Sequence, residues 1–255
     1  MATGLLVLGV NSSTRLLTFI VGLDKQYTAT IRLGQSTTTD DAEGEVISSA
    51  DAAAVTATTD AVISAAVAPL TGTILQRPSS VSAIKVDGKR AYSRVREGET
   101  VVLEPRAVTV STFEILAIAR GDWIDIEVRV ECSTGTYIRA LARDLGAALG
   151  IGGHLTALRR TRIGPFEVGN ATELDDELAS GLLAPSAVAR TLFSAVELSE
   201  QEAVDLTNGK RIALVEQPTS PIAAIAPDGR LVGLVEVVGG RARVLANFPP
   251  DEVTA

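Results

Sequence analysis

Two stretches of the chain alternate strictly between apolar and polar residues. From 123 to 132 the apolar positions fall on every second residue: Ile124, Ile126, Val128, Val130 and Cys132. The stretch 25–34 has the same period of two, and its apolar positions are Tyr27, Ala29, Ile31 and Leu33. This alternation predicts β-strands that bury one face and leave the other polar.

A turn and a helix are predicted directly after the strand at 123–132. Gly135 allows a tight bend and Thr136 can cap a helix. Apolar residues then recur at helical spacing: Ile138, Leu141, Ala142 and Leu145. Tyr137 and Arg139 would lie at the strand-to-helix junction, where free backbone N–H groups can bind an anion or a phosphate. Arg139 could equally be an ordinary surface residue that follows a turn.

The remaining pattern predicts an α+β fold, with a mixed, largely antiparallel sheet and flanking helices. We expect strands at 46–47, 81–86, 101–103 and 108–119, and helices at 11–23, 60–70, 90–97, 172–178 and 185–193. Asp87-Gly88 predicts a hairpin turn. The apolar N-terminus predicts a buried strand. The glycine-rich stretch 151–166 predicts a loop that leads into a short element with a basic edge.

The pattern changes near residue 195. One short helix is expected at 199–206, followed by brief strands at 222–225, 231–237 and 242–245. Turns at 227–229 and 239–240 separate these strands. We therefore predict one large domain at 1–194 and a small, mostly β domain at 195–255.

Composition narrows the function classes. The single cysteine, Cys132, excludes an internal disulfide and fits a reducing compartment such as the cytoplasm. With His154 as the only histidine, a zinc site is disfavoured, and no nucleotide-binding motif indicates an organic cofactor. Neither N-terminal apolar run reaches the roughly 18 residues of a membrane span. We expect a monomer with neither metal nor membrane partner.

The net charge of −8 has the wrong sign for a nucleic-acid binder, but the basic residues are clustered. The clusters are Lys85, Lys89, Arg90, Arg94 and Arg96; Arg139 and Arg143; and Arg159, Arg160 and Arg162. Acidic residues dominate 33–84 and 170–205. These clusters are consistent with a protein that has one basic face bordered by acidic regions. The alternative is that the charged residues lie on solvent-exposed faces of helices.

Several stretches, taken together, resemble the tRNA pseudouridine synthase B family. The blocks are A-T-G-L-L-V-L-G at 2–9, Y-T-A-T-I-R-L-G-Q-S-T-T-T-D-D-A-E-G at 27–44, P-S-S-V-S-A-I-K-V-D-G-K-R-A-Y at 78–92, C-S-T-G-T-Y-I-R-A-L-A-R-D-L-G at 132–146 and G-G-H-L-T-A-L-R-R-T at 152–161. They run in family order and span residues 1 to about 161. The C-terminal part is a looser match to the family's small, PUA-like RNA-binding domain.

The resemblance implies an isomerase that converts the T-loop uridine of tRNA, at position 55, to pseudouridine without a cofactor. The uridine is flipped out of the T arm, an aspartate acts as the nucleophile, and the base rejoins through carbon. Tyr27 matches the tyrosine that stacks on the flipped base, and Leu158 matches an apolar wall of the pocket. Tyr137 matches a tyrosine near the base, and Arg139 matches the arginine that pairs with the aspartate.

Each of these assignments has a simpler alternative. Tyr27, Tyr137 and Leu158 could equally be packing residues of a core. The residues expected to contact phosphate could equally be ordinary solvated surface residues. They are Lys85, Lys89, Arg90, Arg159, Arg160 and Arg162. His154 and Cys132 are not expected to be catalytic.

One departure from the family pattern concerns the nucleophile. The family's aspartate lies in a G-T-L-D-P-x-A-T-G loop, and the chain opens on the x-A-T-G end of that loop. The aspartate would fall two residues before Met1, so we expect a late start or a fragment whose sheet has an exposed edge. Asp24, Asp40 and Asp41 lie in other blocks. Without the aspartate, Arg139 is expected to lose its partner.

Two classes of function therefore remain open from the sequence. The first is a working synthase whose printed sequence lacks its catalytic loop. The second is a non-catalytic protein that binds or folds tRNA. A third, weaker alternative is an unrelated α/β protein that binds a small ligand.

Overall fold

The computed structural model describes residues 2–79, 85–86, 89–90, 103–174, 181–215 and 219–249. It contains two compact units. The first unit combines Met1–Leu5 with Gly22–Gly169, and the second combines Leu6–Val21 with Asn170–Ala255. Because the chain enters the second unit at Leu6 and returns to the first at Gly22, each unit is built from two separate segments.

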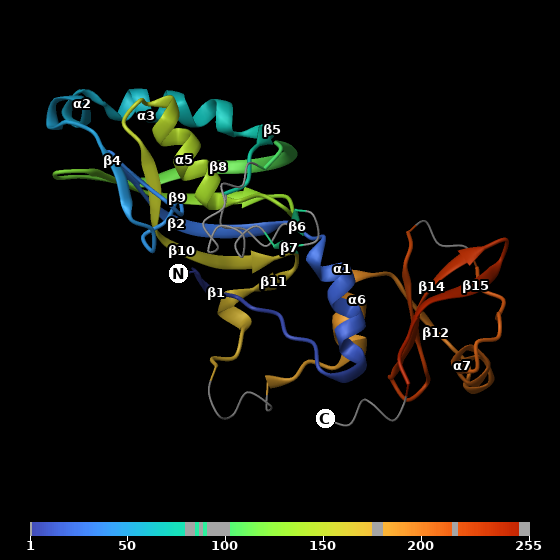
Figure 1. The fold of residues 1–255 in the computed structure, drawn as a ribbon. Helices are drawn as coiled ribbons and strands as arrows, with labels where there is room; N and C mark the ends of the chain where they lie inside the picture. Colours follow the sequence, from blue (N-terminus) through green and yellow to red (C-terminus); the bar gives the residue numbers. More distant parts are fainter. Residues whose placement is uncertain are drawn as a thin grey trace. The chain divides into compact units, whose positions relative to one another are not determined.

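A seven-stranded sheet forms the first unit, and its strand order is β1-β10-β2-β9-β8-β5, with β11 added to β10 (Figure 1). The strands are β1 (Ala2–Gly4), β2 (Lys25–Leu33), β5 (Gly72–Gln76), β8 (Arg106–Arg120), β9 (Ile124–Cys132), β10 (Gly153–Ile163) and β11 (Phe166–Glu167). Every pairing is antiparallel except that of β1 with β10. This confirms the predicted α+β class with a mixed, largely antiparallel sheet.

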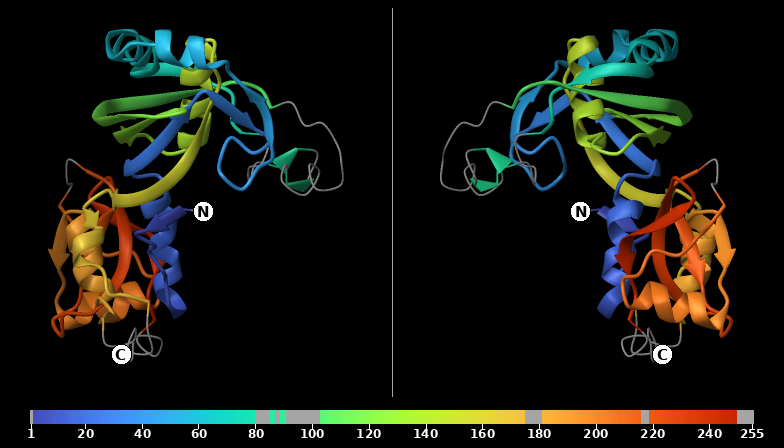
Figure 2. Two further views of the ribbon diagram at one scale, coloured as in Figure 1. Left: turned by 90° about the vertical axis from the view of Figure 1, so that its left-hand side faces the viewer. Right: turned by 90° about the vertical axis from the view of Figure 1, so that its right-hand side faces the viewer.

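Helices cover one face of this sheet, as Figures 1 and 2 show. They are α2 (Ala52–Ala57), α3 (Asp60–Val67), which continues as a 3-10 turn at Ala68–Leu70, and α5 (Ile138–Ala148). Asp51 and Thr59 cap α2 and α3 with side-chain oxygens. Between helices and sheet lies the main core, to which α5 contributes Ile138, Leu141, Ala142 and Leu145.

Both alternating stretches form the predicted strands in the middle of the sheet. The five apolar positions of β9 are at most 1% exposed. They pair along β2 so that Ile126 lies opposite Ile31 and Val128 opposite Ala29. Opposite residues of an antiparallel pair share a face, so these side chains form a continuous apolar surface under α5.

The prediction for 151–166 is wrong, because Gly153–Ile163 is an 11-residue strand inside the sheet. Two bulges interrupt its pairing with β2, between Leu155 and Ala157 and between Arg160 and Arg162. Each bulge shifts the side-chain alternation by one residue. The period of two is therefore broken in the sequence, although the backbone stays extended.

Two short ladders accompany the sheet. β3 (Gln35–Thr37) pairs with β4 (Val46–Ser49), which confirms the strand expected at 46–47. β6 (Lys85–Val86) pairs with β7 (Lys89–Arg90), the pairing expected of a hairpin. The turn at Asp87-Gly88, residues 81–84 of the strand expected at 81–86, residues 91–97 of the helix expected at 90–97 and residues 101–102 lie outside the described residues. Arg90 itself belongs to a strand and not to a helix.

The second unit contains a four-stranded sheet ordered β12-β13-β14-β15. Its elements are α6 (Pro185–Leu192), β12 (Ala195–Glu197), α7 (Glu200–Thr207), β13 (Ile222–Ile225), β14 (Leu231–Val238) and β15 (Arg241–Asn247). A complete capping box between Ser199 and Glu202 begins α7. The N-terminal segment joins this unit as a 3-10 turn (Asn11–Leu16) and α1 (Leu17–Val21), where Phe19 meets Phe193 edge-on at 5.4 Å.

Two expectations differ from the structure near the unit borders. The N-terminal strand is an exposed outer strand and not a buried one, since β1 pairs only with β10 among the described residues. The longer segment of the second unit begins at Asn170, and the domain border at 194/195 stays a prediction. Within the helix expected at 172–178, Thr172–Leu174 is irregular, and 175–178 lies outside the described residues.

Candidate active site

The junction between β9 and α5 is held by a buried glutamine from another strand. Gln76, at the end of β5, is 1% exposed. Its side-chain oxygen accepts a hydrogen bond from the Tyr137 N–H at 2.8 Å, and its amide nitrogen donates to the Tyr137 carbonyl at 3.1 Å. Tyr137 is the residue before the first turn of α5. Gln76 therefore fixes the backbone from which Tyr137 and Arg139 project.

Arg139 has a carboxylate partner in this structure. Its guanidinium lies 3.0 Å from Oδ2 of Asp41 and also donates to the Thr39 carbonyl at 3.4 Å. Both charged side chains are largely enclosed, with 23% of Arg139 and 17% of Asp41 exposed. The expectation that Arg139 lacks a partner is therefore wrong, because the T-T-T-D-D loop between β3 and β4 folds over the start of α5.

This loop is held in place by its own hydrogen bonds. Oδ1 of Asp41 accepts from the Thr39 hydroxyl at 2.5 Å and from the Glu43 N–H at 3.1 Å. The Thr37 hydroxyl donates to the Asp41 carbonyl at 2.8 Å. Asp40 adopts a left-handed backbone (φ 60°), and its carbonyl accepts from the Leu155 N–H at 3.1 Å. The carboxylate of Asp41 is thus oriented before any ligand arrives.

A second ion pair lies one helical turn further along α5. Arg143 is 3.4 Å from Oδ2 of Asp40 and 2.8 Å from Oδ1 of Asp144. It also donates to the Arg77 carbonyl at 2.7 Å. Because residues 139 and 143 are four apart, they share one face of the helix. Two arginines on that face therefore bind two consecutive aspartates of the loop.

The two aspartates differ in their protonation behaviour. Burial raises the pKa of Asp41, but hydrogen bonds from Thr39, Glu43 and Arg139 outweigh it, so the pKa lies below its ordinary value. For Asp40 burial dominates: its pKa is raised although the positive charge of Arg143 opposes the shift. Asp41 is therefore held as a carboxylate beside Arg139.

Tyr27 and Leu158 lie on the helix-covered face of the sheet, next to this junction in the core. Leu158 is paired with Ala29, and both Tyr27 and Leu158 pack against the main core cluster that includes Ile138. Burial raises the pKa of the Tyr27 hydroxyl, so the phenol stays neutral at physiological pH. A half-buried aromatic and an aliphatic side chain thus line the same end of the sheet.

Of the three arginines on β10, Arg160 faces differently from the other two. Arg160 lies opposite Tyr27 and forms a hydrogen bond with its side chain, while its Nε donates to the Leu5 carbonyl at 2.8 Å. The structure therefore places Arg160 beside the candidate stacking residue and not on an open surface. Arg162 pairs with Glu131 at 3.4 Å.

Arg159 is exposed and lies opposite Thr28, on the polar face of the sheet. The backbones of Lys85, Lys89 and Arg90 belong to the β6–β7 ladder, but their side chains lie outside what the structure describes. Of the expected phosphate contacts whose side chains are described, Arg159 is therefore the one most open to solvent.

Sequence reasoning missed Gln76 and Asp41 as site residues. The signal for Asp41 was present, because the T-T-T-D-D-A-E-G block precedes a return strand and combines turn residues with two carboxylates. Gln76 gives no comparable signal: it is a polar residue at a strand end, and its partner lies 61 positions away.

Cys132 and His154, which are not expected to be catalytic, are both buried. Cys132 is 1% exposed, and burial raises its pKa to about 11. His154 is 4% exposed, and its Nδ1 lies 3.2 Å from the Gln35 carbonyl. Within the described part of the chain, no group of three His, Cys, Asp or Glu side chains could hold a metal ion. No helix there is long and apolar enough to cross a membrane.

Family models and curated relatives match nearly the whole chain. Residues 1–138 match the TruB family pseudouridylate synthase N-terminal domain, 139–192 the tRNA pseudouridylate synthase B C-terminal domain, and 193–249 the tRNA pseudouridine synthase II C-terminal model. The tRNA pseudouridine synthase B of Leifsonia xyli is 59% identical over 99% of this chain and 85% of its own length. The protein of that name from Arthrobacter is 56% identical over 98% and 85%.

Solved structures with a similar fold come from H/ACA ribonucleoproteins. An H/ACA RNP bound to a substrate RNA containing 2′-deoxyuridine matches with a TM-score of 0.63 at 19% identity, over 94% of this chain and 70% of that one. A Cbf5-Nop10-Gar1 complex matches with a TM-score of 0.62 at 21% identity, over 94% and 71%. At these identities the likeness supports the fold. Together with the family models and the relatives, it leads to one conclusion: the chain belongs to the tRNA pseudouridine synthase B family.

Proposed function

We propose that this protein isomerises a uridine of tRNA to pseudouridine, and that the target is the T-loop uridine at position 55. The observation that carries the proposal is the Arg139–Asp41 pair at the start of α5, beside the end of the sheet that bears Tyr27 and Leu158. The family membership and the names of the relatives support the reaction class. The position in the T loop rests on the resemblance of the sequence blocks.

The proposed chemistry is an internal rearrangement of one nucleotide. The bond from C1′ of the ribose to N1 of uracil breaks, the uracil turns, and a bond from C1′ to C5 forms. C5 loses a proton and N1 gains one, so the reaction consumes no oxidant or reductant. An uncharged aromatic surface suits a flipped pyrimidine, and Tyr27 is the residue that we assign to stack on it.

We assign to Arg139 the role of orienting the nucleophilic carboxylate. In the family pattern this is the aspartate of G-T-L-D-P, which the printed sequence does not contain. Asp41 holds the guanidinium in a fixed orientation, so the arginine loses little side-chain entropy when it binds a second carboxylate. Asp41 is thus a positioning residue in this proposal, and Tyr137 lies near the base.

Phosphate binding is assigned to Arg159 and to Lys85, Lys89 and Arg90, with Arg162 contributing if its pair with Glu131 opens. An exposed arginine on a sheet surface contacts a phosphate without reading the base. The non-catalytic alternative, a protein that only binds or folds tRNA, shares these contacts. Catalysis must therefore be tested apart from binding.

Binding is tested by the salt dependence of the affinity for a tRNA transcript. The Arg159→Ala variant should bind more weakly and should reduce the slope of log K against log salt by about one. Arg129→Ala is the matched control, because Arg129 is also exposed but pairs with Glu114. Equal effects of the two variants would show that net charge alone is responsible, and would remove Arg159 from the RNA contact.

Catalysis is tested by pseudouridine formation in the same transcript. The printed chain is expected to form none, since a missing nucleophile removes the covalent step itself. A chain extended before Met1 by an upstream segment that ends in G-T-L-D-P is expected to be active. Turnover by the printed chain would show that another carboxylate acts as the nucleophile. Binding without turnover by the extended chain would favour the non-catalytic alternative.

A further inference from the structure

Two buried polar side chains lie close together in the sequence at the end of β5. The buried polar side chains of the described residues are Ser12, Thr37, Thr58, Gln76, Ser79 and His154. Gln76 ends β5 and is 1% exposed, and Ser79 follows three residues later with no exposed surface. A buried polar group costs free energy unless it is hydrogen-bonded. The partners of these two side chains therefore show what the segment 76–79 holds in place.

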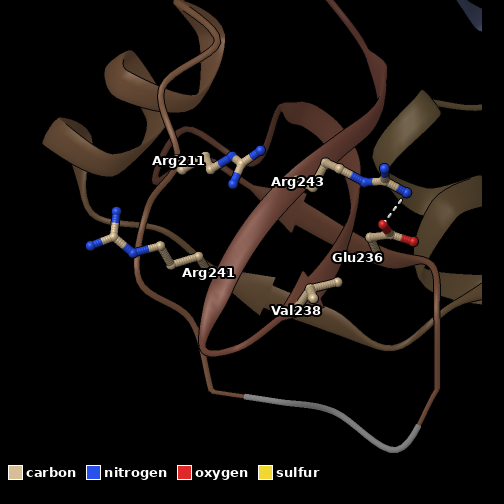
Figure 3. Close-up of a pocket in the computed structure, with 5 residues that line it drawn as sticks. All are labelled: Arg211, Glu236, Val238, Arg241 and Arg243. Atoms are coloured by element: carbon tan, nitrogen blue, oxygen red, sulfur yellow. Dashed lines mark ion pairs between the residues drawn. The ribbon is translucent and has the colours of Figure 1, made fainter.

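The polar side chains around a hollow of the second unit are more exposed. This hollow has a volume of about 320 Å³ and lies on the β14–β15 hairpin (Figure 3). Its lining residues are Arg211, Glu236, Val238, Arg241 and Arg243. Arg243 forms an ion pair with Glu236, but 61% of the arginine side chain is exposed. An exposed ion pair contributes little to stability, so this pair does not impose a fixed geometry on the hollow.

Gln76 fixes the start of α5, which is not capped by its own sequence. Tyr137 occupies the N-cap position of this helix, and its side chain makes no capping hydrogen bond. The residues preferred at this position are Ser, Thr, Asp and Asn, whose side-chain oxygens bind free backbone N–H groups. Here the amide of Gln76 binds the Tyr137 N–H at 2.8 Å and the Tyr137 carbonyl at 3.1 Å. The first turn of α5, which carries Arg139, is therefore held against β5.

Ser79 contacts the loop that carries the partner of Arg139. The Ser79 hydroxyl donates to the Thr39 carbonyl at 3.3 Å, and the same carbonyl accepts from Arg139 at 3.4 Å. The Thr39 hydroxyl in turn donates to Oδ1 of Asp41 at 2.5 Å. Ser79 therefore helps to set the position at which the loop presents Asp41 to the arginine.

The backbone of the segment 76–79 is itself restrained. Gln76 pairs with Arg106 in the β5–β8 ladder. The Arg77 carbonyl accepts from the Arg143 guanidinium at 2.7 Å, and Pro78, whose ring fixes φ, is buried. The segment is therefore held by β8 on one side and by α5 on the other, and it connects the two partners of the Arg139–Asp41 pair.

We propose that Gln76 and Ser79 are positioning residues for the isomerisation, because together they set the separation and orientation of Arg139 and Asp41. Gln76 acts on the arginine through the backbone of Tyr137, and Ser79 acts on the aspartate through the backbone of Thr39. Both side chains are buried, so they act without contacting RNA. These roles rest on the proposed function for the reaction that they serve, whereas the geometry of the ion pair can be measured without any reaction.

The rate test uses single turnover at saturating tRNA, with the chain extended by an upstream segment that ends in G-T-L-D-P. Gln76→Met keeps the length of the side chain but removes both hydrogen bonds to Tyr137. It should lower the rate roughly tenfold or more, because a small displacement of a group at the reacting centre is costly. Ser79→Ala removes one hydrogen bond and should lower the rate roughly threefold. Both variants should keep Kd for tRNA within about twofold of the parent.

The matched control is Gln26→Met. The Gln26 amide also makes two side-chain hydrogen bonds, donating to Glu131 at 2.7 Å and accepting from Thr161 at 2.9 Å. Its side chain lies on the face of β2 opposite to that of Tyr27, which packs against the main core. Gln26→Met should lower the unfolding temperature and keep the parent rate. A rate loss as large as that of Gln76→Met would show that stability alone is responsible, and would overturn the positioning roles.

A double-mutant cycle with Arg139→Lys separates positioning from a general loss of structure. If Gln76 acts through Arg139, Gln76→Met should lower the rate by no more than about twofold in the Arg139→Lys background. Equal losses in the two backgrounds would mean that Gln76 acts by another route, and would overturn its role. If Gln76→Met does not fold, the same cycle with Ser79→Ala decides in the same way.

The Nε–H signal of Arg139 in ¹⁵N spectra of the printed chain reports on the ion pair without catalysis. This signal should shift in Gln76→Met and in Ser79→Ala, and it should stay in place in Gln26→Met. If the extended parent forms no pseudouridine while the signals shift as expected, the proposed function is wrong and the positioning of the pair stands. Signals that stay in place in both test variants would overturn the inference, whatever the rates.

Discussion

At the scale of single residues, the buried thiol gives the simplest check of the core. Cys132 closes the apolar row of β9, and burial raises its pKa to about 11. A thiol must ionise to react, so Cys132 should not react with a thiol reagent at pH 8 in the native protein. One thiol per chain should react after unfolding in guanidinium. Rapid labelling of the native protein would mean that the end of β9 is open to solvent.

The two aspartates of the site loop should lose different amounts of stability when they are neutralised. At pH 7 Asp41→Asn should destabilise the protein by about 1–3 kcal/mol, because it removes the acceptor of a charged hydrogen bond. Asp40→Asn should cost less, since the folded state disfavours the charged form of Asp40. Urea unfolding of both variants measures this difference, and an equal or larger loss for Asp40→Asn would contradict it.

The pH dependence of these variants follows from the direction of each shift. The pKa of Asp41 is lower in the folded protein than its ordinary value of 3.8, so its contribution is present above that pH and is lost as the pH falls. The difference in the free energy of unfolding between the parent and Asp41→Asn should therefore shrink at acidic pH. The pKa of Asp40 is raised, so its unfavourable contribution at neutral pH should be relieved as the pH falls.

The location of candidate site residues could be predicted where adjacent elements carried the information. Tyr137 and Arg139 lie at the expected junction of a strand, a turn and a helix, and their roles in catalysis stay predictions. The pairing of Arg139 with Asp41 could not be predicted, because the two residues lie 98 positions apart and only the folded loop joins them. The faces of the β10 arginines could not be predicted either, because the bulge between Arg160 and Arg162 puts Arg162 on the same face as Arg159 and leaves Arg160 on the face of Tyr27.

At the scale of elements, the contact between α5 and β10 depends on Gly146. A Cβ atom at this position would lie 2.1 Å from backbone atoms of both Gly152 and Gly153. Alanine favours an isolated helix by about 1 kcal/mol over glycine. In this protein Gly146→Ala should nevertheless destabilise by at least 2 kcal/mol, because backbone atoms cannot move aside as a side chain can.

The control for Gly146→Ala is Gly121→Ala. Gly121 has no atom within 4 Å of an added Cβ, so its replacement should change the free energy of unfolding by no more than about 0.5 kcal/mol. Thermal unfolding of both variants distinguishes the cases. A Gly146→Ala variant as stable as the parent would mean that α5 is not held closely against the start of β10.

The elements themselves were predictable where one face is buried without interruption. In β2 and β9 the alternation is uninterrupted and both strands were predicted correctly. In β10 the alternation is broken by two bulges. At the N-terminus the apolar run at 5–10 is irregular, and the strand β1 is formed by Ala2–Gly4 just before it. Periodicity in the sequence reflects which side chains are buried. It therefore fails to predict a strand whose backbone pairs with a neighbour but whose side chains do not bury one uninterrupted face.

At the scale of the whole molecule, Arg139→Lys tests whether the two-pronged guanidinium is needed. In the chain extended by G-T-L-D-P, the lysine variant should lose at least tenfold in single-turnover rate, because an ammonium group cannot hold two carboxylates in fixed geometry. Affinity for tRNA should change little, since the pair acts at the reacting centre. An unchanged rate would remove Arg139 from the active site.

The most direct measurement of the central claim is the mapping of pseudouridine in a tRNA transcript after treatment with the extended chain. Chemical modification specific for pseudouridine, followed by primer extension, should give one stop, at the T-loop uridine at position 55. The same extension with asparagine in place of its aspartate should give none. Pseudouridine at another position, or none at all from a chain that binds the transcript, would contradict the proposed function.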